Sequence, residues 1–460
     1  MRVFKMVSVL LVLTLAIAWL VSNSSPTSTA QEKKDVKTTS DSNITNLKVS
    51  HGLTKTAKNC VECHAKIQPG IVNDWKNSRH AHSGVSCIDC HQQPKDSPMA
   101  AQNCEGVKGT DVYVSIMVTP KTCQKCHPNE VKQFNESGHY RARIQYDLDK
   151  SKHPKAKTEG LNKLFSYHEG QNHPELKMAS EKTGCMQCHG SIIKMDANKR
   201  PTAETWPNAG MGTIWPDGSV GNCVTCHTRH KFDIAEARKP EACASCHLGP
   251  DHPDIEIYES SKHGQIYKAE HATWKFDDAP GAWEPGSYRA PTCATCHMSG
   301  IGDLETTHNV TRRLHWNLWA KVSKVRNSPD PLSMWTGEGV RGRKEMKKVC
   351  SNCHSSLHTE GFFKQGDKAV RLYNEAYFAP AEKMRKELKA KGLLKENPWA
   401  DEFQKIYYHL WHHEGRRARQ GSLMGGPDYA HWHGFFELMQ DLYKLQDIHK
   451  ARLKNGKIEE

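Results

Sequence analysis

Eight copies of one short motif carry most of the chemistry visible in this sequence. Of its 17 cysteines, 16 form C-x-x-C pairs, and a histidine follows each pair at once: CVECH, CIDCH, CQKCH, CMQCH, CVTCH, CASCH, CATCH and CSNCH. Two thiols at this spacing can bond to both vinyl groups on one edge of a porphyrin, and the next imidazole then binds the iron. Each motif is therefore a complete attachment site for a covalent haem c.

The residues expected to hold eight haems follow from these motifs. The thioether cysteines are Cys60, Cys63, Cys87, Cys90, Cys123, Cys126, Cys185, Cys188, Cys223, Cys226, Cys243, Cys246, Cys293, Cys296, Cys350 and Cys353. The proximal iron ligands are His64, His91, His127, His189, His227, His247, His297 and His354. Structural zinc or disulfides would explain paired cysteines, but neither requires a histidine after every pair. The one cysteine outside a pair, Cys104, is interpreted as an ordinary buried or weakly reactive thiol.

Low-spin electron-transfer haems need a second imidazole, and three histidines share a recurring context. The segments WKNSRH, FNESGH and YESSKH end at His80, His139 and His263, each 12 to 16 residues beyond a motif. A repeated context indicates a repeated role, so we expect these three to be distal ligands. Further distal candidates are His230, His308, His358, and His413 or His433. Proximity in sequence does not say which haem each one serves.

The N-terminus has the features of a secretory signal peptide. Arg2 and Lys5 precede an apolar stretch over 6–21, and a small-x-small site ends at Ala30. We expect cleavage after Ala30, a disordered polar leader over 31–50, and an exported, periplasmic protein that is soluble once cleaved. An uncleaved membrane anchor is the alternative, because the apolar stretch falls just short of a span.

The formal charge of +13 would ordinarily suggest a nucleic-acid partner. Loss of the signal peptide removes two positive charges, and each ferric haem with two ionised propionates adds about −1. The expected total is then only roughly +3, with most of the excess Lys and Arg pairing with propionates. We therefore expect no nucleic-acid partner.

A mainly α fold is expected, because only 37% of the residues are hydrophobic and the haems must fill the interior. Short helices and loops should wrap eight haems in a cytochrome c domain over 51–360. A helical segment over 361–460 should pack on the haems and on a neighbouring subunit. Its three expected long helices lie within 379–392, 397–415 and 427–447, starting near Pro380, at an Asn397 cap and at an Asp428 cap, with Gly392 past the end of the first.

In a protein that only transfers electrons, two imidazoles would bind every haem iron. An enzyme needs at least one iron with a free coordination position and with acid or base groups near it. Asp251 and His252 stand side by side after the sixth motif. A carboxylate beside an imidazole can relay protons at neutral pH. The dipeptide alone is also typical of a solvated loop.

Several segments together resemble the octahaem hydroxylamine oxidoreductase family. They are the eight motifs, GPDHPDIEIYESSKHG, APTCATCHMSG with TTHNVTRRLHWNLW, and HHEGRRARQGSLMGGPDYAHWHGFFEL, and the resemblance covers 50–450. It implies that the fourth haem, held by Cys185, Cys188 and His189, is catalytic with one axial ligand, and that the other seven are bis-histidine. It also implies that Asp251 and His252 lie above the open iron.

One tyrosine divides that family. In its oxidative members a neighbouring subunit's tyrosine is cross-linked to the catalytic porphyrin, and Tyr429 in GPDYAHWHG is the matching position; a tyrosine packed near a helix start is the alternative. A pocket tyrosine of some relatives has no counterpart in RRLHWNLW, where His315 or Trp316 stands. This departure puts the substrate in doubt.

The resemblance implies an enzyme that oxidises hydroxylamine, or hydrazine, at the fourth haem. Electrons would pass through the other seven haems to a cytochrome acceptor, and a homotrimer is expected because the tyrosine must reach a neighbour. Two alternatives stay open: a nitrite reductase of the same family without the cross-link, and a non-catalytic electron conduit.

Overall fold

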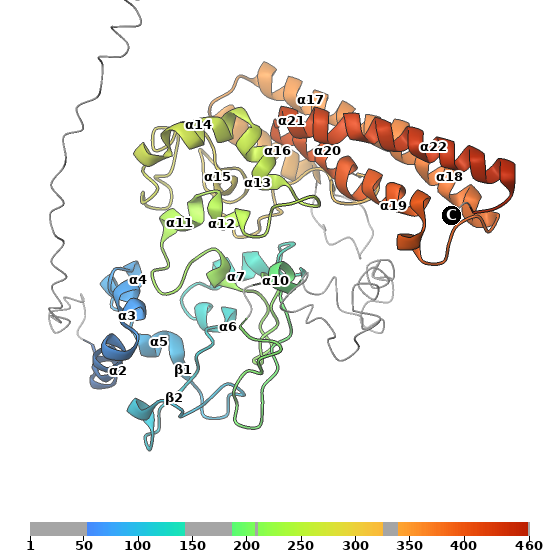
Figure 1. Cartoon of the computed structure of the whole chain (residues 1–460). Helices are drawn as coiled ribbons and strands as arrows, with labels where there is room; N and C mark the ends of the chain where they lie inside the picture. The colour runs from blue at the N-terminus through green and yellow to red at the C-terminus, as the bar shows by residue number, and fades with distance from the viewer. Residues whose placement is uncertain (1–52, 143–185, 208–209, 325–338, 459–460) are drawn as a thin grey trace, which may run out of the picture. The chain divides into compact units, whose positions relative to one another are not determined.

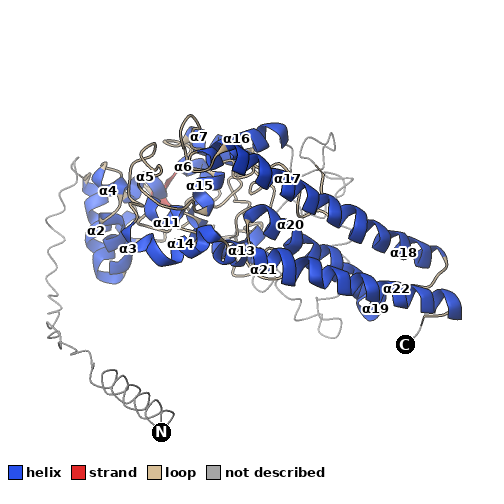
Figure 2. Cartoon of the chain, turned by 90° about the horizontal axis from the view of Figure 1, so that it is seen from above, coloured by secondary structure: helices blue, strands red, loops and turns tan. Residues whose placement is uncertain are grey.

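The computed structural model describes residues 53–142, 186–207, 210–324 and 339–458, nearly all of them helix, turn or loop (Figure 1; Figure 2). The signal peptide, the polar leader and Cys185 of the fourth motif lie outside the described residues, so these predictions stay untested. Among the described residues, no helix is both long and apolar enough to cross a membrane.

Seven of the eight motifs lie before residue 300; the fifth begins at the 3₁₀ turn Cys223–Thr225, and the others overlap helices. The helices of this part of the chain are short. They are α2 Lys55–Ile67, α3 Pro69–Lys76, α4 Arg79–His82, α5 Cys87–His91, α6 Pro120–Cys123, α7 Pro128–Asn135, α10 Met186–His189, α11 Ile234–Arg238, α12 Glu241–Ala244, α13 Asp254–Ser260, α14 Lys262–Glu270 and α15 Cys293–His297. Short 3₁₀ turns lie at Glu105–Val107, Cys223–Thr225 and His271–Thr273. The one sheet of the described part pairs β1 Gln92–Gln93 with β2 Tyr113–Val114 in antiparallel register.

Local capping explains why some motifs begin a helix at their first cysteine. Ser86 precedes α5, and its backbone N–H donates to the Asp89 carboxylate at 2.7 Å. Thr292 precedes α15 and forms the equivalent reciprocal pair with Thr295. Because residues three apart lie on the same face of a helix, a cap at this place directs both thiols of a motif to one side.

The C-terminal region consists of long helices, as the sequence predicts. Their bounds are α16 Gly339–Ser351, α17 Ser356–Leu372, α18 Ala379–Ala390, α19 Glu402–His409, α20 Gly415–Met424, α21 Pro427–Ala430 and α22 Glu437–Asn455. Three π-helical turns, Tyr373–Phe378, Leu410–Glu414 and His431–Phe436, join α17 to α18, α19 to α20 and α21 to α22. A 3₁₀ turn lies at Pro398–Ala400.

One of the predicted helix starts is wrong, and another continues an existing helix. Pro380 lies at the start of α18, as predicted, but the chain enters α18 directly from the preceding π-helical turn, whose wider winding is a common site of adjustment in a continuing helix. Asp428 is not a cap, because Pro427 already occupies the first helical position after Gly426. Asn397 does cap a turn, accepting from the N–H of Trp399, but that turn is 3₁₀ and Asp401 caps α19. Gly392 ends α18 at φ +69°, as expected.

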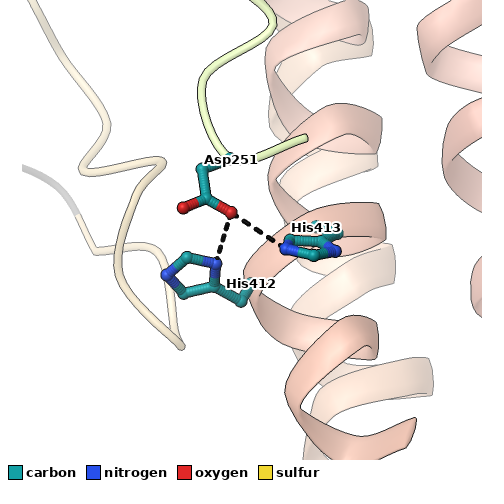
Figure 3. Close-up of side chains that lie close together, drawn as sticks. All are labelled: Asp251, His412 and His413. Carbon is teal, nitrogen blue, oxygen red and sulfur yellow. Dashed lines mark ion pairs between the residues drawn. The ribbon is translucent and has the colours of Figure 1, made fainter. Parts of the chain in front are cut away.

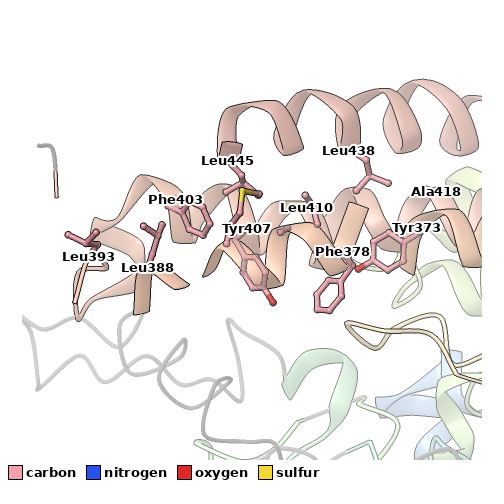
Figure 4. Close-up of a cluster of buried hydrophobic side chains, with 12 residues drawn as sticks. Tyr373, Phe378, Leu388, Leu393, Phe403, Tyr407, Leu410, Ala418, Leu438 and Leu445 are labelled. Atoms are coloured by element: carbon pink, nitrogen blue, oxygen red, sulfur yellow. The ribbon is translucent and has the colours of Figure 1, made fainter. Parts of the chain in front are cut away.

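A continuous apolar core holds the long helices together (Figure 4). Phe403, Leu410, Leu438 and Leu445 are fully buried in it, together with Tyr373 at the π-helical turn after α17. Side chains from α18, α19 and α22 meet there, so these helices pack on one another through apolar faces. A second cluster of aromatic side chains, including Trp283 and Tyr288, lies around α14.

Candidate haem-binding and active site

Five of the motif histidines face a second histidine at nearly one distance. The pairs, with the separation of ring centroids, are His80–His127 (6.1 Å), His91–His230 (6.1 Å), His139–His247 (6.1 Å), His227–His308 (6.4 Å) and His263–His354 (6.1 Å). Metal–imidazole bonds of about 2 Å put the ring centres of two trans ligands about 6 Å apart. The spacing therefore fits an iron between each pair, and the residues present suit bis-histidine haems.

The three repeat histidines, together with His230 and His308, are the ones brought opposite motif histidines. Three other candidates lie elsewhere. His358 stacks on His354 at 4.3 Å, which leaves no room for an iron between the two rings. His413 contacts Asp251, and His433 lies beside Tyr429 with a ring separation of 5.3 Å. The remaining motif histidines make other contacts: His64 with Gln68, His189 with the carbonyl of Ala142, and His297 with the backbone of Val310.

The two histidines near His354 allow a sharp test of axial ligation. The substitution His263→Ala should convert one haem from a low-spin to a high-spin form, because it removes the imidazole across from His354. The variant His358→Ala is the matched control and should keep the wild-type spectrum, since His358 lies beside His354 rather than opposite it. Electron paramagnetic resonance of the oxidised holoproteins measures both. A high-spin signal from the His358 variant alone would contradict this assignment.

Attachment thiols of different motifs lie next to one another. The neighbouring pairs are Cys60 with Cys87, Cys90 with Cys123, Cys123 with Cys223, Cys226 with Cys243, Cys188 with Cys246, Cys243 with Cys293, and Cys296 with Cys350. They connect the motifs in the order first, second, third, fifth, sixth, seventh and eighth, and the fourth joins at the sixth. Since each thiol would mark one edge of a porphyrin, the haem sites adjoin in this order, with the fourth site beside the sixth.

A carboxylate supports the proximal histidine of the sixth motif. Nδ1 of His247 lies 2.7 Å from Oδ2 of Asp254, which begins α13. Burial alone would lower the pKa of His247, but Asp254 outweighs burial and raises it to about 9. A carboxylate in this position fixes the orientation of a ligating imidazole and increases its basicity. Asp254 is not among the site residues predicted from the sequence, although it stands seven residues after the motif histidine.

Asp251 is bracketed by two imidazoles from far along the chain (Figure 3). Its Oδ1 lies 2.8 Å from Nδ1 of His412 and 2.9 Å from Nε2 of His413, although the His412 N–H points away from the line of a good hydrogen bond. Burial works to raise the pKa of Asp251, yet the two imidazoles and the charge of Arg416 outweigh burial and hold it well below its usual range. The carboxylate is therefore ionised at neutral pH.

The expected pairing of Asp251 with His252 is replaced by contacts to these other histidines. His252 instead packs edge-on against Trp319, with ring centroids 4.7 Å apart, and Trp319 in turn lies 5.9 Å from His247. Burial, followed by the charge of Arg416, lowers the pKa of His252 to about 3, so its imidazole is neutral. Burial also lowers the pKa of His412, to about 4.

The two consecutive histidines that reach one oxygen of Asp251 both lie in the π-helical turn Leu410–Glu414. Such a turn inserts an extra residue into a helix and is frequent at functional sites. The sequence signal was present in the segment HHEG, but a π-helical turn cannot be recognised from periodicity.

Tyr429 is half-buried at the start of α21, and burial raises its pKa. Its backbone is held where α20 and α21 cross: a Cβ built on Gly421 would lie 2.7 Å from the Tyr429 carbonyl carbon. Only glycine allows this close approach. The tyrosine ring lies near His433, and the helices position it through their backbones.

Comparisons with known proteins agree with this reading of the motifs. Residues 216–398 match a family model described as "Seven times multi-haem cytochrome CxxCH". Residues 169–248 match "Cytochrome c7 and related cytochrome c", and residues 19–92 match "Cytochrome c554 and c-prime". The chain therefore carries multiple covalent c-type haems.

One curated relative and two solved structures extend the match. The relative, from Kuenenia stuttgartiensis, is named "Probable nitrite reductase-hydroxylamine oxidoreductase fusion protein". It is 28% identical to this chain over 340 residues, which are 65% of this chain and 34% of the relative. This chain therefore spans about a third of the relative's length. A "Hypothetical multiheme protein" matches 88% of this chain and 96% of its own, with a TM-score of 0.74 and 24% identity. The "Kuenenia stuttgartiensis reducing HAO-like protein complex Kustc0457/Kustc0458" matches 88% of each chain, with a TM-score of 0.59 and 21% identity. Motifs, fold and these comparisons together show a mainly helical multihaem c-type cytochrome that is similar to hydroxylamine oxidoreductase-like proteins.

Proposed function

We propose that this protein is an octahaem oxidoreductase that oxidises hydroxylamine or hydrazine at its fourth haem, held by Cys185, Cys188 and His189. Electrons would leave through the other seven haems to a cytochrome acceptor. One observation carries the proposal: an ionised carboxylate, Asp251, held between two imidazoles five residues beyond Cys246. Cys246 neighbours Cys188, so this loop belongs to the surroundings of the fourth motif.

When bound, the fourth haem would supply an iron that takes the substrate nitrogen and accepts its electrons. The protein supplies the groups that move protons. Oxidation of either substrate releases protons, and an ionised carboxylate in contact with imidazoles can accept them. Burial keeps His412 neutral near pH 7 and Asp251 works in the opposite direction, so the two groups can pass a proton on without holding it. His252, also neutral, would line the site beside Trp319.

The order of the attachment thiols supports a route by which electrons would leave the fourth haem. The fourth motif joins the path at the sixth, through Cys188 and Cys246. From there the path runs both toward the first motif and toward the eighth. We infer that electrons from the fourth haem enter the row at the sixth and reach the acceptor from one of its ends. Export to the periplasm and assembly as a homotrimer belong to the same proposal.

A second candidate function is nitrite reduction on the same haem. The names of two relatives favour it, since one contains a nitrite reductase and another is called reducing. Assays with hydroxylamine, hydrazine and nitrite on one purified sample separate the two. Our proposal expects haem reduction by hydroxylamine or hydrazine. Turnover of nitrite alone would overturn it.

The state of Tyr429 provides an independent prediction. If the protein is oxidative, proteolysis under denaturing conditions should yield the Tyr429 peptide bound to a haem peptide, and Tyr429→Phe should abolish this adduct. The control Tyr443→Phe, on an exposed residue of α22, should keep it. Mass spectrometry of the haem peptides detects whether the Tyr429 adduct is present. A wild-type protein without the adduct would favour the reductase.

A further inference from the structure

A second group of metal-ligating side chains surrounds the π-helical turn after α19. The ligand atoms of His409, His413 and Glu414 all lie within 4.8 Å of one another. The rings of His409 and His413, four residues apart, have centroids separated by 4.6 Å. Two histidines at this spacing on a helix are an established way to hold a metal ion. None of the three residues belongs to a C-x-x-C-H motif.

Glu414 is buried without the partners that a carboxylate requires. Its side chain is only 9% exposed, and Oε2 makes no hydrogen bond. The nearest cation, Arg417, lies 3.8 Å from the other oxygen, Oε1. Burial raises the pKa of Glu414 to about 8, and the negative charge of Asp441 adds to this effect. A buried, unsatisfied carboxyl group costs free energy that a bound cation would offset.

The donors determine which cation fits. Two imidazoles and one carboxylate suit zinc or ferrous iron, whereas calcium and magnesium prefer oxygen ligands throughout. His409 is exposed and provides a path for an ion to enter. The contact between Asp251 and Nε2 of His413 leaves the second ring nitrogen of His413 as the one to bind a metal. A carboxylate that holds the far nitrogen of a ligating histidine is the usual support of such a site.

We propose that His409, His413 and Glu414 form a binding site for a divalent transition-metal ion of the zinc and ferrous-iron class, separate from the haem irons. The ion would hold His413 in place and so fix the ring that contacts Asp251. This inference does not depend on the substrate or on the direction of the reaction. Binding can therefore be measured without turnover.

Zinc is the probe, because it has no redox chemistry with the haems. The holoprotein is stripped with a chelator, dialysed against micromolar Zn²⁺, and analysed for zinc by mass spectrometry, with haem iron as the internal count of chains. We expect one tightly bound zinc per chain. Loss of either ligand in His409→Ala or Glu414→Gln should weaken binding by more than roughly tenfold. His431→Ala removes an exposed histidine at another π-helical turn and should bind like the wild type.

X-ray absorption at the zinc edge identifies the ligands. A first shell of nitrogen and oxygen without sulfur supports the site, whereas sulfur would place the zinc on cysteines and overturn it. Wild-type protein without tight zinc would also overturn the proposal, as would equal binding by the His409 and Glu414 variants. Both variants should retain the haem absorbance of the wild type, since one residue is exposed and the other substitution preserves shape.

Discussion

Replacing Asp251 with asparagine should slow substrate oxidation by roughly 100- to 10,000-fold, the range typical of a lost acid–base group. The amide keeps the size of the side chain but cannot carry the negative charge that Asp251 presents to His412 and His413. Haem content should not change, because Asp251 belongs to no attachment motif. Steady-state oxidation of hydroxylamine with an artificial acceptor, together with the ratio of haem to protein, measures both effects.

Asp428→Asn is the matched control for this variant. Asp428 also contacts an imidazole, at 3.5 Å from Nε2 of His433, but it lies outside the group around Asp251. Its activity should equal that of the wild type. If Asp251→Asn lost haem and activity in equal proportion, the role of Asp251 would be structural. If its activity were unchanged, Asp251 would have no part in proton transfer.

Of the substitutions described, Arg452→Leu should lower the free energy of unfolding most. Nη1 of Arg452 lies 3.1 Å from both carboxylate oxygens of Asp401, and the two side chains are 3% and 0% exposed. The same Nη1 donates to the carbonyl of Leu393, so the pair joins α22 to the segment between α18 and α19. Removing one partner leaves a buried charge without compensation and costs about 3–5 kcal/mol. Thermal unfolding followed by circular dichroism should show a lower Tm.

The surface pair Lys405–Glu402 supplies the control for this experiment. Its side chains are 43% and 62% exposed, so Lys405→Leu should change stability by less than about 1 kcal/mol. Acidification adds a second test. Burial works to raise the pKa of Asp401, but Arg452 and two backbone N–H groups outweigh it and lower the pKa. The contribution of the carboxylate is present at neutral pH and is lost as the pH falls below about 4. The difference in Tm between wild type and Arg452→Leu should narrow there; a constant difference would contradict the ionic explanation.

The local sequence was sufficient to predict the three histidines of the repeated segments as distal haem ligands. His80, His139 and His263 each follow an aromatic residue and a serine at fixed spacing. In two of these repeats, the serines Ser78 and Ser261 cap the helix that carries the histidine. All three serines, Ser137 included, donate to the carbonyl of the aromatic residue three positions before them. The pattern was visible because serine and histidine lie within one helical turn of each other.

Contacts between residues that are far apart in the sequence could not be predicted in this way. His412 and His413 stand about 160 positions beyond Asp251, and only the packing of the folded chain brings them to it. The same limitation made His358 a distal candidate, because its place near His354 in sequence says nothing about the side of the iron on which it lies. The continuation of the helix through Pro380 likewise depends on a π-helical turn that periodicity does not reveal.

Covalent haem attachment is settled within five consecutive residues, so the sequence by itself determined the class of protein and its motif cysteines and histidines. A mainly helical fold with long C-terminal helices followed from helix caps and apolar spacing, which are also local. Only the tertiary structure decided which histidine faces which motif, the order in which the attachment thiols adjoin, and the groups around Asp251. These depend on packing between segments far apart in the chain, where spacing in sequence no longer limits distance in space.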